Sequence, residues 1–251
     1  MNEIYTPGYS ANAMDFMSRR SAEQQARFLL PHLKSGQRLL DIGCGPGTIT
    51  LGLAEILASG EVVGIDLAES QLSVARQNAA QNKIENASFV SGSIYQLPFA
   101  NEEFDVVFAH AVFEHLKEPI AALQEIRRVL KPNGLVALRS PDWGGFIVAP
   151  ETSGLQIAIK RYTDIQTANG GDIYAGRKFP SLLRAGRLKI KSFSASFECY
   201  ESPSLVGEYL ALRLVTEGAH DEAQALREWS KHPDAIFAQA WCEIIGTRAT
   251  D

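Results

Sequence analysis

Short apolar runs alternate with longer segments of mixed polarity between residues 38 and 140. The runs are rich in branched and aromatic residues and end at turn-forming residues, which is typical of buried strands. In the longer segments apolar residues recur every three or four positions, which is typical of helices. We expect strands at residues 38–42, 61–66, 87–93, 104–110 and 135–140.

The predicted helices lie before and between these strands, at residues 18–33, 48–58, 70–82 and 118–130. Ser21 and Gln24 have the spacing of a capping box in the first helix, and residues 131–134 (KPNG) form a stop signal after the last one. Alternating strands and helices make parallel strands with right-handed crossovers. The predicted fold is therefore α/β, a doubly wound Rossmann-like sheet that is mostly parallel, with helices on both faces.

The last hundred residues follow a different pattern. A helix is predicted at residues 151–168, and alternating apolar positions predict a sixth strand at residues 188–200. Residues 203–231 have a helical pattern, whereas residues 237–247 fit either a strand or a helix. We favour an antiparallel last strand, which makes residues 203–231 a helical insertion between two neighbouring strands.

The chain length of 251 residues suits one α/β domain, and 45% apolar residues are enough to bury a full core. We expect three parts within this domain. They are an N-terminal helical or lid segment at residues 1–34, a cofactor-binding core at residues 35–140, and an accessory substrate-pocket region with the last two strands at residues 141–251.

Charge and cysteine content narrow the functional classes. A net charge of −5 argues against nucleic acid as a partner, because phosphate neutralisation needs a basic surface. No signal peptide or membrane span is expected, since the first residues lack a basic start followed by an apolar stretch and no run of 18 apolar residues occurs. The three scattered cysteines suggest neither a disulfide framework nor a metal site, so a cytoplasmic protein without a metal is expected.

Residues 39–50 (LLDIGCGPGTIT) join the first strand to the next helix and contain three glycines. Amides at a helix N-terminus can receive a polar ligand, and glycine lets the backbone approach it closely. Thr48 stands where a dinucleotide motif has its third glycine, and Pro46 lacks an amide hydrogen. The loop is therefore a poor pyrophosphate cradle; an ordinary tight turn is the structural alternative.

Asp66 ends the second predicted strand, 19 residues after Gly47. An acid in this position of a doubly wound fold accepts hydrogen bonds from ribose hydroxyls, although it could instead cap the next helix. We therefore expect a ribose-bearing ligand, with or without phosphates.

Four segments together resemble the five motifs of class I S-adenosylmethionine-dependent methyltransferases: LLDIGCGPG, GIDLAESQLSVAR, GSIYQLPFANEEFDVVFAHAVFEHL (the third and fourth motifs together) and RRVLKPNGLVALRS. The resemblance covers residues 37–140 and is closest to the small-molecule branch that includes the ubiquinone and menaquinone methyltransferases. It implies S-adenosyl-L-methionine as cofactor, S-adenosyl-L-homocysteine as product, and methyl transfer to a small-molecule acceptor by in-line displacement.

The same resemblance implies a set of cofactor-binding residues. Asp66 would hold the ribose and Gln71 would border the adenine, while Ser93 stands where the family usually has an acid bonded to the adenine amino group. The full set is Asp41, Gly43, Cys44, Gly45, Gly47, Asp66, Leu67, Gln71, Gly92, Ser93, Ile94, His110, Ala111 and His115.

Catalytic and acceptor-binding residues are less defined. His110 and His115 flank the turn after the fourth strand, where they could act as a base, line the cofactor or be structural. Asp142 and Trp143 follow the fifth strand, at the edge where open α/β sheets bind ligands; a polar turn is the alternative. Candidates from the accessory region are Tyr174 and Arg177, for which a solvated loop is the favoured alternative.

The N-terminal segment YTPGYS is either a frayed tail or a lid, and in the second case Arg19 or Arg20 could meet a carboxylate. No [DN]PPY tetrapeptide, the signature of nucleobase amino methylation, follows the fourth strand. A cofactor-binding module without catalysis and an NAD-type oxidoreductase are the remaining alternatives. Neither the acceptor atom nor the oligomeric state is indicated.

Overall fold

The computed structural model describes residues 5–8 and 11–249. Its elements in chain order are α1 (Ala11–Ser18), α2 (Ala22–Gln25), η1 (Leu30–His32), β1 (Arg38–Ile42), α3 (Thr48–Leu57), β2 (Glu61–Asp66), α4 (Glu69–Asn82), β3 (Ala87–Ser91), β4 (Phe104–His110), η2 (Phe113–His115), α5 (Pro119–Val129), β5 (Leu130–Ala149), α6 (Ser153–Ala168), α7 (Ala175–Ala185), β6 (Leu188–Cys199), α8 (Pro203–Thr216), α9 (His220–Trp229) and β7 (Ile236–Arg248).

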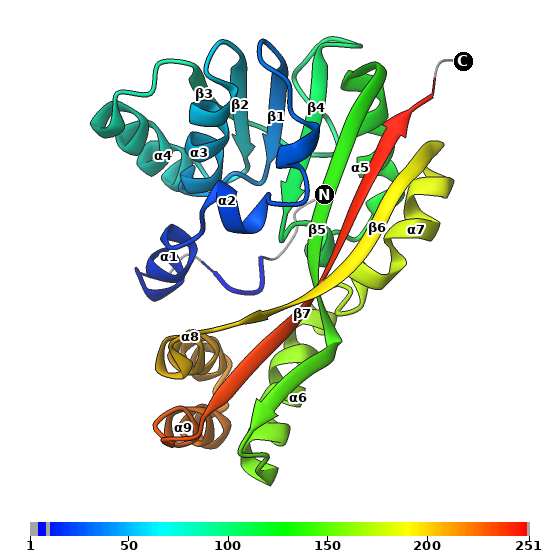
Figure 1. Cartoon of the computed structure of the whole chain (residues 1–251). Helices are drawn as coiled ribbons and strands as arrows, with labels where there is room; N and C mark the ends of the chain where they lie inside the picture. The colour runs from blue at the N-terminus through cyan, green and yellow to red at the C-terminus, as the bar shows by residue number, and fades with distance from the viewer. Residues whose placement is uncertain (1–4, 9–10, 250–251) are drawn as a thin grey trace.

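The strands form one seven-stranded sheet in the order β3-β2-β1-β4-β5-β7-β6. The first five strands pair in parallel, while β7 pairs antiparallel with both β5 and β6. The sheet crosses the upper part of the molecule in Figure 1. The predicted doubly wound, mostly parallel fold with an antiparallel last strand is confirmed.

Helices cover both faces of the sheet because successive residues of its central strands point to opposite sides. Leu39 of β1 packs with α2 and α3 on one face, and its neighbour Leu40 packs with α5 and α7 on the other. Both side chains are fully buried. The carboxyl ends of the parallel strands are thus held rigidly at one edge, where ligands of such sheets bind.

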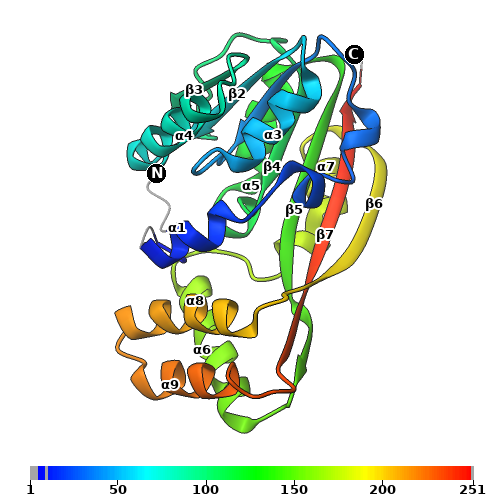
Figure 2. The same ribbon diagram turned by 60° about the vertical axis from the view of Figure 1, so that its left-hand side comes forward.

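A second apolar cluster lies below the sheet and is built around the far ends of β5 and β7. These strands extend beyond their neighbours, and α6, α8 and α9 pack against the extension (Figure 2). The predicted helical insertion is confirmed, since α8 and α9 lie between β6 and β7 in the chain. We call the three helices α6, α8 and α9 together the helical lobe. In the described part of the chain no helix has the length and apolar character needed to cross a membrane.

Two predicted elements had wrong bounds, and one helix was not predicted. The single helix at residues 18–33 is instead α1, α2 and η1, and the cap partner is Gln25, whose Oε1 accepts the Ser21 amide at 2.7 Å. The fifth strand continues past residue 140 to Ala149, because β7 supplies an antiparallel partner with a bulge at 142–146. Helix α7 had no prediction; Pro180 lies within it and obscures its helical pattern.

Candidate active site

The glycine loop after β1 needs glycine for two separate physical reasons. Gly43, Gly45 and Gly47 all have positive φ, at 71°, 51° and 80°, a region that other residues avoid. Space is also short: a Cβ on Gly43 would lie 2.5 Å from Val112 Cγ2, and one on Gly47 would lie 2.8 Å from Ala75 Cβ. The loop can therefore neither bend nor pack in this way with larger residues.

The amides of this loop are already used within the protein. Gly43 and Cys44 both donate to the Ile65 carbonyl, at 2.7 and 3.1 Å, and Gly47 donates to Cys44 O at 3.0 Å. Gly45 donates to Asp66 Oδ2 at 2.9 Å, while Pro46 has no amide hydrogen to donate. A pyrophosphate cradle needs free amides, so the geometry argues against a dinucleotide at this loop.

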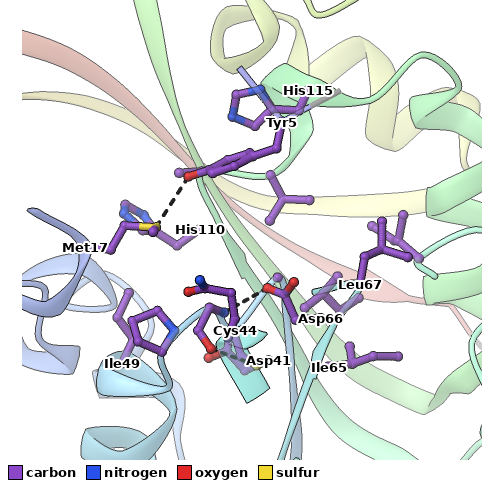
Figure 3. Close-up of a pocket in the computed structure, with 18 of the residues that line it drawn as sticks. Tyr5, Met17, Asp41, Cys44, Ile49, Ile65, Asp66, Leu67, His110 and His115 are labelled. Atoms are coloured by element: carbon purple, nitrogen blue, oxygen red, sulfur yellow. Dashed lines mark hydrogen bonds between the residues drawn. The ribbon is translucent and has the colours of Figure 1, made fainter. Parts of the chain in front are cut away.

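Thirteen of the fourteen predicted cofactor residues line one cavity, at the carboxyl ends of β1, β2 and β4 (Figure 3). The exception is Gly47, which points away from the cavity and packs against α4 and Phe89. Its role is to let the loop fit against α4. We call this space the donor cavity.

Buried polar atoms face the donor cavity without a protein partner. Gln71 Oε1 and His110 Nε2 are buried and make no hydrogen bond among the described residues. Asp41 is 3% exposed, and burial raises its pKa to about 7 although the Thr50 hydroxyl donates to it at 2.6 Å. Asp66 lies at the end of β2, and its pKa is raised by burial. A polar ligand would satisfy Gln71 Oε1 and His110 Nε2, whereas Asp41 and Asp66 already accept hydrogen bonds within the protein.

Three further predicted cofactor residues, Leu67, Ser93 and Ile94, also line the cavity. Leu67 is 57% exposed although it is apolar, and Ile94 also lines the cavity. Ser93 Oγ accepts the Tyr95 amide at 3.2 Å, so it is fixed in orientation. An apolar and flat ligand group would cover this patch.

A second, smaller cavity adjoins the first and shares Tyr5, Arg20, Ala111 and His115 with it. We call it the acceptor chamber. Its walls are rich in aromatic side chains, which come mainly from the helical lobe, from β5 and β7, and from α1. They include Phe16, Trp143, Tyr162, Tyr200, Tyr209, Phe237 and Trp241.

The N-terminal segment covers the boundary between the two cavities. Tyr5 meets the His115 ring edge-on, with centroids 4.9 Å apart, and its hydroxyl donates to Met17 Sδ (Figure 3). Arg20 lines both cavities, and no described carboxylate pairs with its guanidinium; Arg19 is bonded to Asp15 at the surface. Of the predicted lid, Tyr9 and Ser10 lie outside the described residues.

Two titratable residues of η2 lie at the chamber. Glu114 is 3% exposed and accepts a hydrogen bond from Ser140 Oγ at 2.8 Å; burial raises its pKa to about 7. Burial lowers the pKa of His115 to about 3, and that of His110 well below its usual value. Both imidazoles are therefore neutral near pH 7, which makes them weak bases.

Of the four predicted acceptor-binding residues, the structure places one in the acceptor chamber and three outside it. Trp143 lines the acceptor chamber, 5.2 Å from Tyr162 between ring centroids. Asp142 lines neither cavity: it is buried in a bidentate ion pair with Arg177, and that guanidinium lies 4.7 Å from the Tyr174 ring centre. Asp142 lies in β5 and Arg177 in α7, so their ion pair ties these two elements together, while Tyr174 lies in the turn before α7 and is exposed.

Sequence reasoning missed Glu114 and most of the aromatic wall. Glu114 directly precedes the predicted His115, so its position in the FEHL segment was an available signal. The aromatic residues are spread from residue 16 to residue 241 and have no common spacing. Only tertiary packing brings them together.

The fold and this site define the class. A cavity at the strand ends, a glycine loop with its amides already used and an acid at the end of β2 fit S-adenosyl-L-methionine rather than a dinucleotide. Residues 33–183, more than half of the chain, match the family model described as a methyltransferase domain. The chain belongs to the class I S-adenosyl-L-methionine-dependent methyltransferases, as the sequence motifs predicted.

Individual relatives agree with this assignment. A protein of Aspergillus luteorubrus named "Probable methyltransferase ltbC" is 37% identical over 96% of both chains. The demethylmenaquinone methyltransferase of Staphylococcus aureus is 37% identical over 41% of this chain and 43% of its own length. The chain thus spans about half the length of some curated relatives that it matches.

A solved structure shares the fold at low identity. It is geranyl diphosphate C-methyltransferase from Streptomyces coelicolor, in complex with Mg²⁺, geranyl diphosphate and S-adenosyl-L-homocysteine. It has a TM-score of 0.59 and 18% identity, and the match covers 90% of this chain and 78% of that one.

Proposed function

We propose that this chain transfers the methyl group of S-adenosyl-L-methionine to a small-molecule acceptor. The observation that supports this most directly is the pair of adjoining cavities, one lined by the residues of the methyltransferase motifs and the other rich in aromatic rings. When bound, S-adenosyl-L-methionine supplies an electrophilic methyl group. The protein's part is to hold donor and acceptor in line and to exclude water.

The donor would be held by contacts along the donor cavity. Asp66 would bond the ribose hydroxyls, with Gln71 beside the adenine and Leu67 and Ile94 on its faces. Gly43 and Gly45 would let the methionine part approach the backbone. Cys44 would contribute shape alone, because burial raises the pKa of its thiol and keeps it protonated.

Arg20 would bind the methionine carboxylate of the donor. Its guanidinium lies where the two cavities meet and has no carboxylate partner among the described residues. An arginine can hold a carboxylate through two parallel hydrogen bonds. Tyr5 would then close over the reacting groups, as the predicted lid requires.

The three expected parts of the domain divide this work. We propose that residues 35–140 bind the donor, and that residues 141–251 together with the segment 1–34 enclose the acceptor. The cysteines Cys44, Cys199 and Cys242 are all unpaired, which supports a reducing, cytoplasmic setting.

Calorimetry tests the donor assignment, and labelled methyl transfer tests the activity. We expect S-adenosyl-L-methionine and its product to bind, and NAD not to bind. Tighter binding of NAD would overturn the assignment. Donor binding without transfer to any member of a broad acceptor panel would instead identify a cofactor-binding module.

A further inference from the structure

We propose that the acceptor is a flat aromatic ring carrying an acidic hydroxyl group, and that Glu114 is the base that removes the hydroxyl proton. This inference rests on the proposed function, because it takes the methyl donor to occupy the neighbouring donor cavity. It names the substrate class and a base that the sequence motifs did not single out.

The shape of the chamber favours a ring. Its aromatic side chains already pack as rings do: Phe16 stacks on Tyr209 at 4.2 Å between centroids, and Trp143 lies tilted against Tyr162 at 5.2 Å. Aromatic groups pair by offset stacking and edge-to-face contact, so such walls select a flat partner. Aliphatic side chains are a minority of the lining, with Val206 and Leu210 on α8 among them.

Glu114 is a carboxyl group built into this wall. Its backbone carbonyl accepts the Asp172 amide at 2.9 Å and Gln166 Nε2 at 3.2 Å, which holds η2 in place. Its carboxylate accepts the Ser140 hydroxyl at 2.8 Å and lies 3.8 Å from His115 Nε2. A buried acid with two fixed backbone contacts and one side-chain hydrogen bond can present its remaining lone pairs to a ligand.

The groups around Glu114 decide its protonation near neutral pH. Burial is the largest influence and raises its pKa to about 7, while its own backbone amide, the Ser140 hydroxyl and the positive charges of Arg20 and Arg139 act in the opposite direction. Arg139 is itself paired with Glu198 and Glu243. His115 and Tyr162, which also line the chamber, are uncharged near pH 7 because burial disfavours their ionised forms.

The proton balance selects an acidic acceptor over an amine. The acceptor oxygen forms a bond to the methyl carbon, the carbon–sulfur bond breaks, and its electron pair goes to sulfur to give the neutral thioether. The hydroxyl proton passes to the Glu114 carboxylate and leaves to solvent after the product. A neutral amine attacks through its free lone pair and gains little from a base, so a carboxylate at this place is useful to a phenol.

The test compares wild type with Glu114→Gln, which keeps the shape of the side chain and removes the base. Tritiated S-adenosyl-L-methionine is used with two probe acceptors, 1-naphthol and a nitrophenol that is already ionised at the assay pH. We expect kcat for naphthols to fall at least about 100-fold in Glu114→Gln, and kcat for the ionised phenol to fall far less. Donor affinity by calorimetry should not change, and the exposed control Glu118→Gln should behave as wild type.

The pH profile gives a second measurement. Wild-type kcat for naphthol should rise with pH through an apparent pKa near 7 and level off, and Glu114→Gln should lose this rise. Removing the Ser140 hydroxyl with Ser140→Ala should move the rise to higher pH, because a hydrogen bond that favours the carboxylate is lost.

Different failures have different meanings. Equal losses for both phenols, or none, would show that Glu114 is not the base. Donor binding together with methylation of amines alone, or with no phenol bound to the product complex, would overturn the acceptor class and leave the donor site intact. If the wild-type protein does not bind S-adenosyl-L-methionine, the proposed function itself is overturned.

Discussion

The donor cavity and the acceptor chamber touch each other but are assembled differently. Apart from the N-terminal segment, the donor cavity is lined by residues between 41 and 116, which follow consecutive parallel strands. The acceptor chamber takes residues from position 5 to position 241, from both the sheet and the helical lobe. The donor cavity is therefore formed by residues that lie close together in the sequence, whereas the acceptor chamber is formed only when distant segments pack together.

The donor half, which is the donor cavity, and the acceptor half, which is the acceptor chamber, each contain a buried acid whose pKa is raised to about 7. Asp41 in the donor half and Glu114 in the acceptor half each accept one hydroxyl hydrogen bond, from Thr50 and Ser140. In both halves burial disfavours the ionised carboxylate. The variants below separate the halves by changing one and leaving the other.

Gly43→Ala should have the largest effect and should be confined to the donor half. A left-handed conformation costs an L-residue about 1 to 2 kcal/mol, and the new Cβ would meet the stiff side chain of Val112. We expect the Kd for S-adenosyl-L-methionine, measured by calorimetry, to rise about 100-fold or more.

The matched control is Gly36→Ala, which has φ of 79° and no atom within 4 Å of the new Cβ. It should lose some stability and keep its donor affinity. Equal affinities for both variants would show that the shape of the glycine loop does not determine donor binding.

Asp66→Ala should weaken donor binding by about 1 to 3 kcal/mol, the range for a hydrogen bond to a charged group. The carboxylate also accepts the amides of Gly45 and Ala68, at 2.9 Å each, so part of the loss comes from the loop. Asp66→Asn keeps one acceptor oxygen and should lose less. Unchanged affinity in titrations of Asp66→Ala would mean that this side chain does not contact the ribose.

Trp143→Ala should affect only the acceptor half. Removing a large side chain from the chamber wall loses about 1.5 kcal/mol or more of apolar contact, so KM for the acceptor should rise about 10-fold with donor affinity unchanged. Tyr174→Ala is the control, because Tyr174 lies outside the chamber against Arg177. A larger effect at Tyr174 in steady-state kinetics would place the acceptor elsewhere.

The smallest effect concerns stability and pH. The pKa of Asp41 is raised from 3.8 to about 7, so its contribution to stability is fully present below pH 4 and is lost as pH rises through 7. The thermal midpoint of the wild type should therefore fall between pH 5 and pH 8, and Asp41→Asn should make this fall smaller. Each kcal/mol of unfolding free energy corresponds to a shift of about 2 to 4 °C in the midpoint. Glu114→Gln should do the same for the acceptor half, and a pH dependence as steep as wild type in both would contradict the assigned pKa shifts.

The interpretation from sequence was accurate where chemistry follows local geometry. Glycines, an acid at a strand end and a turn after β4 lie close along the chain, and the parallel sheet brings their strand ends to one edge. Asp142, Arg177 and Tyr174 line neither cavity, because they pair across elements that sequence could not place side by side, and their contact with an acceptor stays a prediction. Gly47 does not line the cavity, and close packing against α4 gives a separate reason for a glycine there; its contact with the cofactor stays a prediction.

The sequence by itself determined the alternation of strands and helices, the class of methyltransferase and nearly all of the donor cavity. Each of these depends on periodicity or on residues within one strand-loop-helix unit, which the chain order already brings together. Only the tertiary structure decided the acceptor chamber, the position of Arg20 between the cavities and the place of Glu114 among aromatic rings. These depend on contacts between residues as distant as Tyr5 and Trp241, which form because β7 and the helical lobe fold back beside the N-terminal segment.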